Sequence, residues 1–84
     1  MSAFIAKQPN GLYCRFSNIL DCPTHWNMTK EDYLNNYTGT VSNRDEGEVI
    51  LRDYIKPFSE VIERFIPNNM TKKEFDNLVD VMSQ

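Results

Sequence analysis

The chain has 84 residues, of which 9 are Lys or Arg and 12 are Asp or Glu, so its formal net charge is -3. Apolar residues make up 40% and charged residues 25%, which is typical of a folded globular chain and excludes a disordered, collagenous or membrane-embedded one. At the usual stability per residue, such a domain is stable by roughly 4–13 kcal/mol, which leaves little room for an active site with strained or unpaired groups.

Residues 4–16 predict a β-hairpin, because two partly apolar segments flank the turn sequence at residues 8–11, Gln-Pro-Asn-Gly. A type I turn followed by Gly11 in the left-handed region sets a register that brings apolar residues together on one face. The pairs on that face are Phe4 with Phe16 and Ala6 with Cys14.

The other face of this hairpin is chemically mixed. It carries Ile5, Lys7, Tyr13 and Arg15, so we expect it to be exposed to solvent or to contact a partner. After a turn at Ser17-Asn18, residues 19–20 (Ile-Leu) are long enough for a short third strand.

Residues 21–28 have neither helical nor strand periodicity and contain a proline, so they predict a connecting loop. Trp26 lies in this loop, where a polar segment has no need of a large apolar ring. Two positions for this ring are open: it closes the core between hairpin and helices, or it stands at the surface as an anchor for a partner.

Helices are predicted over about residues 30–37 and 72–82. Each is preceded by a threonine, Thr29 or Thr71, with a carboxylate three residues later, which is the arrangement of a capping box. Between them, apolar residues recur at helical spacing over residues 44–66. Pro57 interrupts the hydrogen bonding but not the phase of this stripe, which favours one helix kinked near Pro57 over two separate helices.

These elements predict an α+β fold. An N-terminal β-hairpin, with three short strands as the alternative, packs against three or four helices in a single small domain over residues 1–84.

The residues that carry chemistry do not form a catalytic or metal-binding set. Cys14, Cys22 and His25 supply three ligands, whereas a closed structural zinc site has four, and no oxyanion hole or base is indicated for either thiol. The three glycines are isolated from one another, so no phosphate-binding loop is indicated. We therefore expect no enzyme activity, no metal and no cofactor.

Protein binding is the function that the composition favours. The chain has more large aromatic and Met side chains than so small a body can bury, and these residue types are enriched in protein interfaces. The partner is another protein or a second copy of the chain. The residues expected to contact it are Lys7, Tyr13, Arg15, His25 and Trp26.

A regulator that binds nucleic acid through the hairpin face is the alternative. Lys7 and Arg15 offer two charges there and Tyr13 one stacking ring. Residues 44–84 hold six basic and nine acidic side chains, a local charge of -3. Neutralising a phosphate backbone needs a coherent basic surface, so this alternative is the weaker one.

The absence of an apolar run near the ~20 residues of a membrane helix excludes a membrane span. Residues 1–7 also lack the basic leader and long apolar segment of a signal peptide, so we expect a cytoplasmic protein whose two cysteines are reduced.

Three segments carry a resemblance to known proteins: FIAKQPNGLYCRFS at residues 4–17, PTHWNMT at residues 23–29 and RFIPNNMT at residues 64–71. In these segments the chain resembles a group of short uncharacterised proteins encoded in phages and integrated mobile elements of Gram-positive bacteria. The resemblance implies such a genomic setting. Accessory proteins of these elements often act by binding a host or phage protein, including defence components, and by analogy we expect the same here. It brings no catalytic residue.

Overall fold

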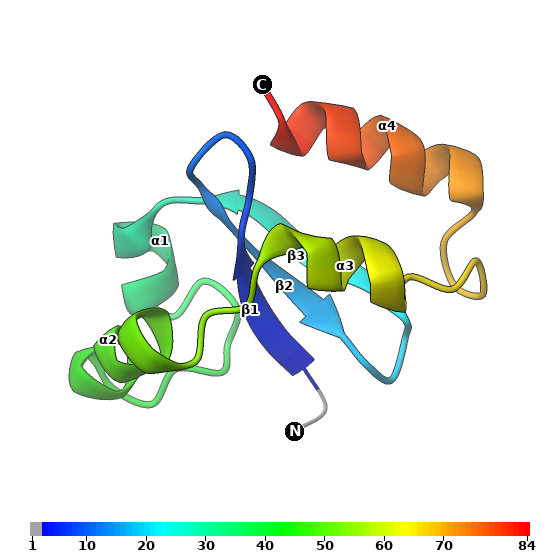
Figure 1. The fold of residues 1–84 in the computed structure, drawn as a ribbon. Helices are drawn as coiled ribbons and strands as arrows, with labels where there is room; N and C mark the ends of the chain where they lie inside the picture. The colour runs from blue at the N-terminus through cyan, green and yellow to red at the C-terminus, as the bar shows by residue number, and fades with distance from the viewer. Residues whose placement is uncertain (1–2) are drawn as a thin grey trace.

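The computed structural model describes residues 3–84, and within them three strands precede four helices (Figure 1). The strands form one antiparallel sheet in the order β1-β2-β3, so the predicted α+β fold is confirmed. The elements are β1 (Ala3–Lys7), β2 (Tyr13–Ser17), β3 (Cys22–Met28), α1 (Lys30–Leu34), α2 (Arg44–Asp53), α3 (Phe58–Arg64) and α4 (Lys72–Met82).

The hairpin of β1 and β2 has the predicted register. Phe4 pairs with Phe16 and Ala6 with Cys14. Gly11 has a φ of 89°, in the left-handed region that the predicted turn requires. The turn sequence and the apolar alternation agree here, which is why the register could be read from the residues.

The predictions for residues 19–28 are wrong in two respects. Ile19 and Leu20 form the turn between β2 and β3, and their N–H groups donate to the Ser17 hydroxyl at 3.2 and 3.1 Å. Residues 22–28, predicted as a loop, form β3. The register of β3 against β2 shifts twice and Asn27 has a φ of 54°, so this edge strand lacks the regular alternation by which strands are recognised.

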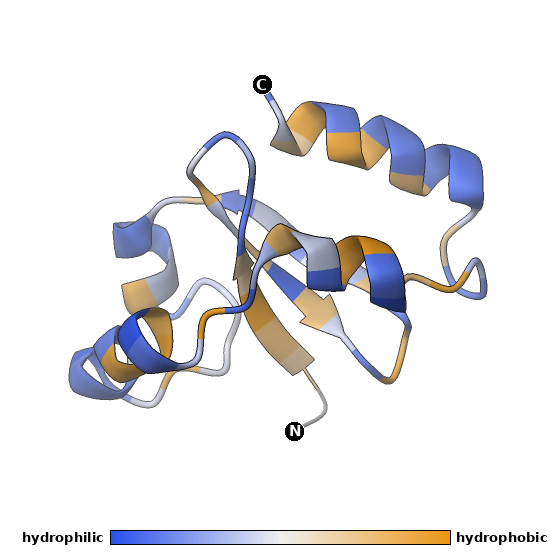
Figure 2. Cartoon of the chain, viewed as in Figure 1, coloured by the Kyte–Doolittle hydropathy of each residue, from blue (hydrophilic) through white to orange (hydrophobic). Residues whose placement is uncertain are grey.

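One face of the sheet packs against α3 and α4, in what we call the first core. Apolar residues of β1 and β2 meet one buried residue of α3 and three of α4. Figure 2 shows the apolar residues along β1 and along both helices. The first core consists of Ala6, Cys14, Phe16, Val61, Phe75, Leu78 and Met82.

The opposite face is covered as well, by α1 and α2 (Figure 1), so the prediction of an open hairpin face is wrong. Ile5 on that face is only 5% exposed. Ile5 is the only buried residue that β1 contributes to this core, because the helices and their connections supply most of the other apolar side chains. Ile50 and Leu51 of α2 also pack against the core. This second core consists of Ile5, Met28, Tyr33, Leu34 and Val41.

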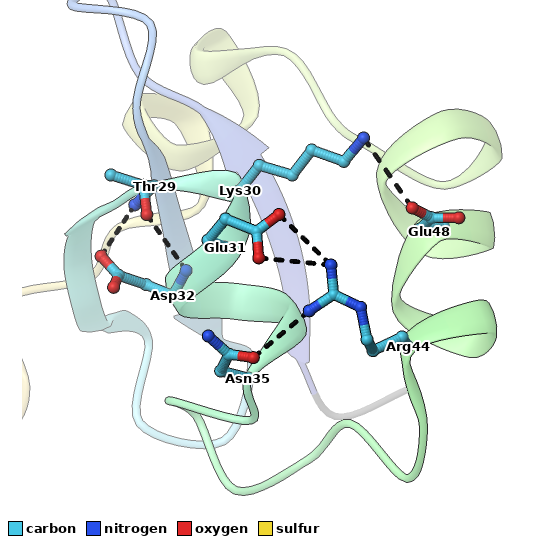
Figure 3. Close-up of polar contacts among 7 residues, drawn as sticks. All are labelled: Thr29, Lys30, Glu31, Asp32, Asn35, Arg44 and Glu48. Atoms are coloured by element: carbon cyan, nitrogen blue, oxygen red, sulfur yellow. Dashed lines mark hydrogen bonds and ion pairs between the residues drawn. The ribbon is translucent and has the colours of Figure 1, made fainter.

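Polar contacts join α1 to α2 at the surface (Figure 3). The Arg44 guanidinium donates to both carboxylate oxygens of Glu31 at 3.2 Å and to Asn35 Oδ1 at 3.2 Å. Lys30 Nζ lies 4.0 Å from a carboxylate oxygen of Glu48. Because these side chains are exposed, each ion pair contributes only about 0–1 kcal/mol.

The stretch 44–66 forms two helices, so the prediction of one kinked helix is wrong. The chain leaves the helical path after Asp53, and Lys56 pairs with the edge of β1 through hydrogen bonds from Lys56 N–H to Ile5 C=O (2.9 Å) and from Lys7 N–H to Lys56 C=O (3.3 Å). Pro57 favours an extended residue before it, which suits this bridge, and caps α3 without needing an N–H of its own.

The other two helices match their predictions more closely. Both capping boxes are present, at Thr29 with Asp32 and at Thr71 with Glu74, and α4 covers the predicted residues 72–82. The first helix is shorter than predicted because the chain turns at Asn36, where φ is 67°.

Candidate functional site

The sheet separates the residues expected to bind a partner. Arg15 pairs with Ile5 on one side and with His25 on the other, so it belongs to the face covered by α1 and α2. Tyr13 packs against the second core on the same face. Lys7 pairs with Tyr13 and so shares this face, but it is exposed at the end of β1. Trp26 lies elsewhere, against α4.

Arg15 and His25 form a small polar cluster with Thr24. Arg15 Nη1 donates to Thr24 Oγ1 at 3.0 Å, and the same hydroxyl lies 3.0 Å from His25 Nδ1. The His25 ring also meets the Tyr37 ring edge-on, with 5.7 Å between centroids. Partial burial, and then the charge of Arg15, lower the pKa of His25, so this imidazole is neutral at physiological pH.

Arg15 also lines a cleft of about 610 Å³, which we call the Arg15 cleft. Its size is that of an ordinary small-ligand or peptide pocket. Three cations, Arg15, Lys56 and Arg64, and one carboxylate, Glu46, line the cleft together with mostly apolar surface. The remaining lining residues are Ala3, Phe4, Ile5, Asn18, Tyr33, Thr40, Ile50 and Tyr54.

Trp26 stands at the surface and does not close the core. Its side chain is 40% exposed and borders a shallow groove along α4. Of the two positions left open by the sequence, the structure has the ring at the rim of the first core. The groove is also lined by Met70, Glu74, Asn77, Leu78 and Val81.

A second apolar surface was not predicted. At the corner where the β2–β3 turn meets the segment after α3, Ile66 N–H donates to Asp21 C=O at 3.1 Å and Asn69 Nδ2 donates to Leu20 C=O at 3.0 Å. Figure 2 shows apolar residues in both segments. We call this surface the turn patch; its members and their exposed fractions are Ile19 (72%), Leu20 (42%), Ile62 (47%) and Ile66 (52%).

Sequence reasoning missed the turn patch because it assigned Ile62 and Ile66 to the buried stripe of a long helix and residues 19–20 to a strand. The signal that was present is the pair of adjacent aliphatic residues directly after Ser17-Asn18, where a turn is expected to be polar.

The thiols are protonated and buried. Burial raises the pKa of Cys14 to about 12, opposed only in part by a hydrogen bond with the Ala6 backbone. Burial and the charge of Asp21 raise the pKa of Cys22. A nucleophilic cysteine needs the opposite shift, so neither thiol has the properties of a catalytic group. Among residues 3–84, no group of three or more His, Cys, Asp or Glu side chains is placed to hold a metal ion.

No family model, curated protein or solved structure matches the chain. None of the helices in residues 3–84 has the length and hydropathy needed to span a membrane. The features of the structure that bear on function are the Arg15 cleft, the groove beside Trp26 and the turn patch.

Proposed function

We propose that the chain is a non-enzymatic protein-binding module, and that the turn patch is its main contact surface. The observation that carries this proposal is that four large aliphatic residues, each at least 42% exposed, lie on two segments that hydrogen bonds hold together at one corner of the fold. Single exposed apolar residues are normal on protein surfaces, whereas a group of them is typical of an interaction site.

Trp26 extends this proposal to a second surface. A half-exposed Trp beside a shallow apolar groove is the kind of residue that anchors protein contacts. The other residues predicted from the sequence, Lys7, Tyr13, Arg15 and His25, lie away from the turn patch and take a secondary part in this proposal.

The partner is a host or phage protein, or a second copy of the chain. This follows from the resemblance to accessory proteins of phages and mobile elements, which also supports a cytoplasmic setting. Such proteins act by occupying a target and need no catalytic group of their own.

Protein binding is favoured over nucleic-acid binding by the cover that α1 and α2 place on the hairpin face. That cover limits Tyr13 and Arg15, the stacking ring and one of the two charges on which the alternative depends, to partial exposure. Phosphate contacts also weaken steeply with salt, whereas an aliphatic contact changes little, so the two functions are separable by one titration.

The experiment compares two variants that carry the same kind of change. Ile19→Asp combined with Ile66→Asp places charges in the turn patch, and Val49→Asp places one on α2, on the other side of the sheet. Each C-terminally tagged protein is incubated with extract of a Gram-positive host, the retained proteins are quantified, and self-association is followed by sedimentation. We expect the patch variant to lose a partner or a dimer that wild type and Val49→Asp retain at both 50 and about 200 mM salt. Retention of every partner by a folded patch variant would contradict the proposal.

A further inference from the structure

The outer edge of β1 is only partly paired. The Lys56 N–H donates to the Ile5 C=O, and the Lys56 C=O accepts from the Lys7 N–H. The peptide groups of Ile5 and Lys7 therefore point away from β2. In an antiparallel strand both peptide groups of one residue point to the same side and alternate with those of the next residue. The N–H of Ile5 and, two residues earlier, the C=O of Ala3 therefore also point outward.

This part of the edge lies in the Arg15 cleft. Ala3, Phe4 and Ile5 all line it, and Lys56 is the one described residue that pairs with the outer edge of β1. An exposed strand edge is a template on which an extended peptide adds as a further strand.

The cleft is positively charged in a chain whose net charge is -3. None of the five ion pairs among residues 3–84 includes Arg15 or Lys56. Arg64 pairs with Glu60, which does not line the cleft, and Glu46 is the single carboxylate that does. A ligand that matches this lining carries a negative charge. The planar guanidinium of arginine binds a planar oxyanion such as a carboxylate through two parallel hydrogen bonds.

We infer that the Arg15 cleft binds an extended acidic peptide segment of a protein partner. The peptide main chain pairs with β1 alongside residues 3–5, and a Glu or Asp side chain meets Arg15 or Lys56. This inference rests on the proposed protein-binding function but uses a surface separate from the turn patch, so each can fail without the other.

A peptide fits the cleft better than a nucleic acid does. Unpaired main-chain groups at a strand edge are matched by another main chain, whereas a phosphate backbone would pass Glu46 and, on the same helix, Asp45 and Glu48. The opposite edge of the sheet is a poor template, because β3 contains Pro23, two register shifts and a left-handed residue at Asn27.

The probe is a blocked peptide of alternating valine and glutamate, titrated into the 15N-labelled full chain and followed by amide chemical shifts. Two matched peptides serve as controls: one with glutamine in place of glutamate, and one N-methylated along one edge. We expect saturable shifts at the amides of Phe4, Ile5 and Lys56. Loss of a charge-assisted contact, in the glutamine peptide, or of main-chain hydrogen bonds to β1, in the N-methylated peptide, is expected to weaken binding about tenfold or more.

Three protein variants complete the test. Arg15→Gln and Lys56→Gln remove cations from the cleft, and the second keeps the test valid if loss of the Thr24 contact disturbs the fold. Arg52→Gln is the matched control, since Arg52 is exposed, pairs with Asp53 and does not line the cleft. We expect weaker binding for the first two variants and unchanged binding for the third.

Four results would overturn the inference: no saturable shift at millimolar peptide, equal binding of the glutamine peptide, binding that withstands both cleft variants, or shifts at the same amides that are stronger with oligothymidylate. Loss of a partner by the turn-patch variant would still support the proposed function in each of these cases.

Discussion

The two faces of the sheet are built from alternate residues of the same strands, yet they are covered in different ways. On the first face, Ala6, Cys14 and Phe16 pack under the eleven-residue helix α4 and under α3. On the second, Ile5 packs under the five-residue helix α1 and under α2. With only five residues, α1 has little stability of its own, so it depends mainly on packing against the sheet and α2, with a small contribution from exposed ion pairs.

The two covers also border different candidate binding surfaces: the turn patch and the groove beside Trp26 adjoin α3 and α4, and the Arg15 cleft adjoins α2. The first core holds the sheet together, whereas the second cover leaves the Arg15 cleft open between α2 and the edge of β1. Regions with few buried apolar contacts open locally at lower free energy than the global unfolding of a domain. The second core has five buried residues against seven in the first, so we expect the cover formed by α1 and α2 to open at a lower free energy than the first core.

Substitution of Phe16 by Ala should destabilise the first core. Phe16 is fully buried and stacks on Phe4 with 5.2 Å between ring centroids, so the free energy of unfolding should fall by about 3–5 kcal/mol. That is a large share of the stability of a small domain, and most of the variant should be unfolded at 37 °C. Urea titration followed by circular dichroism measures the change. Ile19→Ala, at an exposed position, is the control, and an equal effect of the two variants would show that the first core is misplaced.

Substitution of Ile5 by Ala tests whether the second face is covered at all. Because Ile5 is 5% exposed within the second core, we expect a loss of about 2–3 kcal/mol in the free energy of unfolding. An open hairpin face would give a loss below about 0.5 kcal/mol, as for other surface substitutions. The same urea titration distinguishes the two results.

Gly47 tests how tightly the second core is packed, because the absence of a side chain lets α2 approach α1 closely. A Cβ at this position would lie 2.7 Å from Leu34 Cδ2 and 3.1 Å from Val41 Cγ1. Gly to Ala within a helix normally stabilises by up to about 1 kcal/mol, but overpacking a core costs about 1–3 kcal/mol. We expect Gly47→Ala to lower the thermal midpoint, corresponding to a net loss of about 1 kcal/mol. A raised midpoint would indicate a looser second core than the structure has.

The smallest expected effect concerns pH and His25. Its folded pKa lies below the ordinary value of 6.5, so the unfolded chain binds the proton more readily. This contribution to stability is present above pH 6.5 and is lost as the pH falls through 6.5 toward the lower, folded pKa. The difference in stability between wild type and His25→Gln, measured by denaturant titration across this range, should therefore shift against wild type at acidic pH. A difference independent of pH, or one of opposite sign, would contradict the environment described for this ring.

Much of the fold was predictable because local signals agreed with one another. The turn at residues 8–11, the apolar alternation in β1 and β2 and the two capping boxes all specify one structure. The edge strand β3 was missed because its bulges hide the strand period, and the break before Pro57 because Lys56 pairs with a strand distant in sequence. Long-range pairing of this kind leaves no periodic pattern in the residues themselves.

The candidate binding surfaces were harder to predict than the fold. Arg15 and Trp26 were predicted to be contact residues from their chemistry. The hairpin register places Arg15 on the face of Ile5, whereas the face that Trp26 occupies depends on the register of β3. The turn patch depends on residues 19–20 and 62–66 meeting in space, which no local pattern reports.

Amide hydrogen exchange, measured residue by residue, shows whether helices cover both faces of the sheet and whether the two covers differ in the free energy needed to open them. We expect the amides of β2 and α4 to exchange only through global unfolding, and those of α1 and α2 to be protected but to exchange through a local opening of lower free energy. Ile5→Ala should lower that local free energy more than the global one. Equal protection of α1, α2 and α4 would contradict the unequal strength, and no protection in α1 and α2 would contradict the second cover itself.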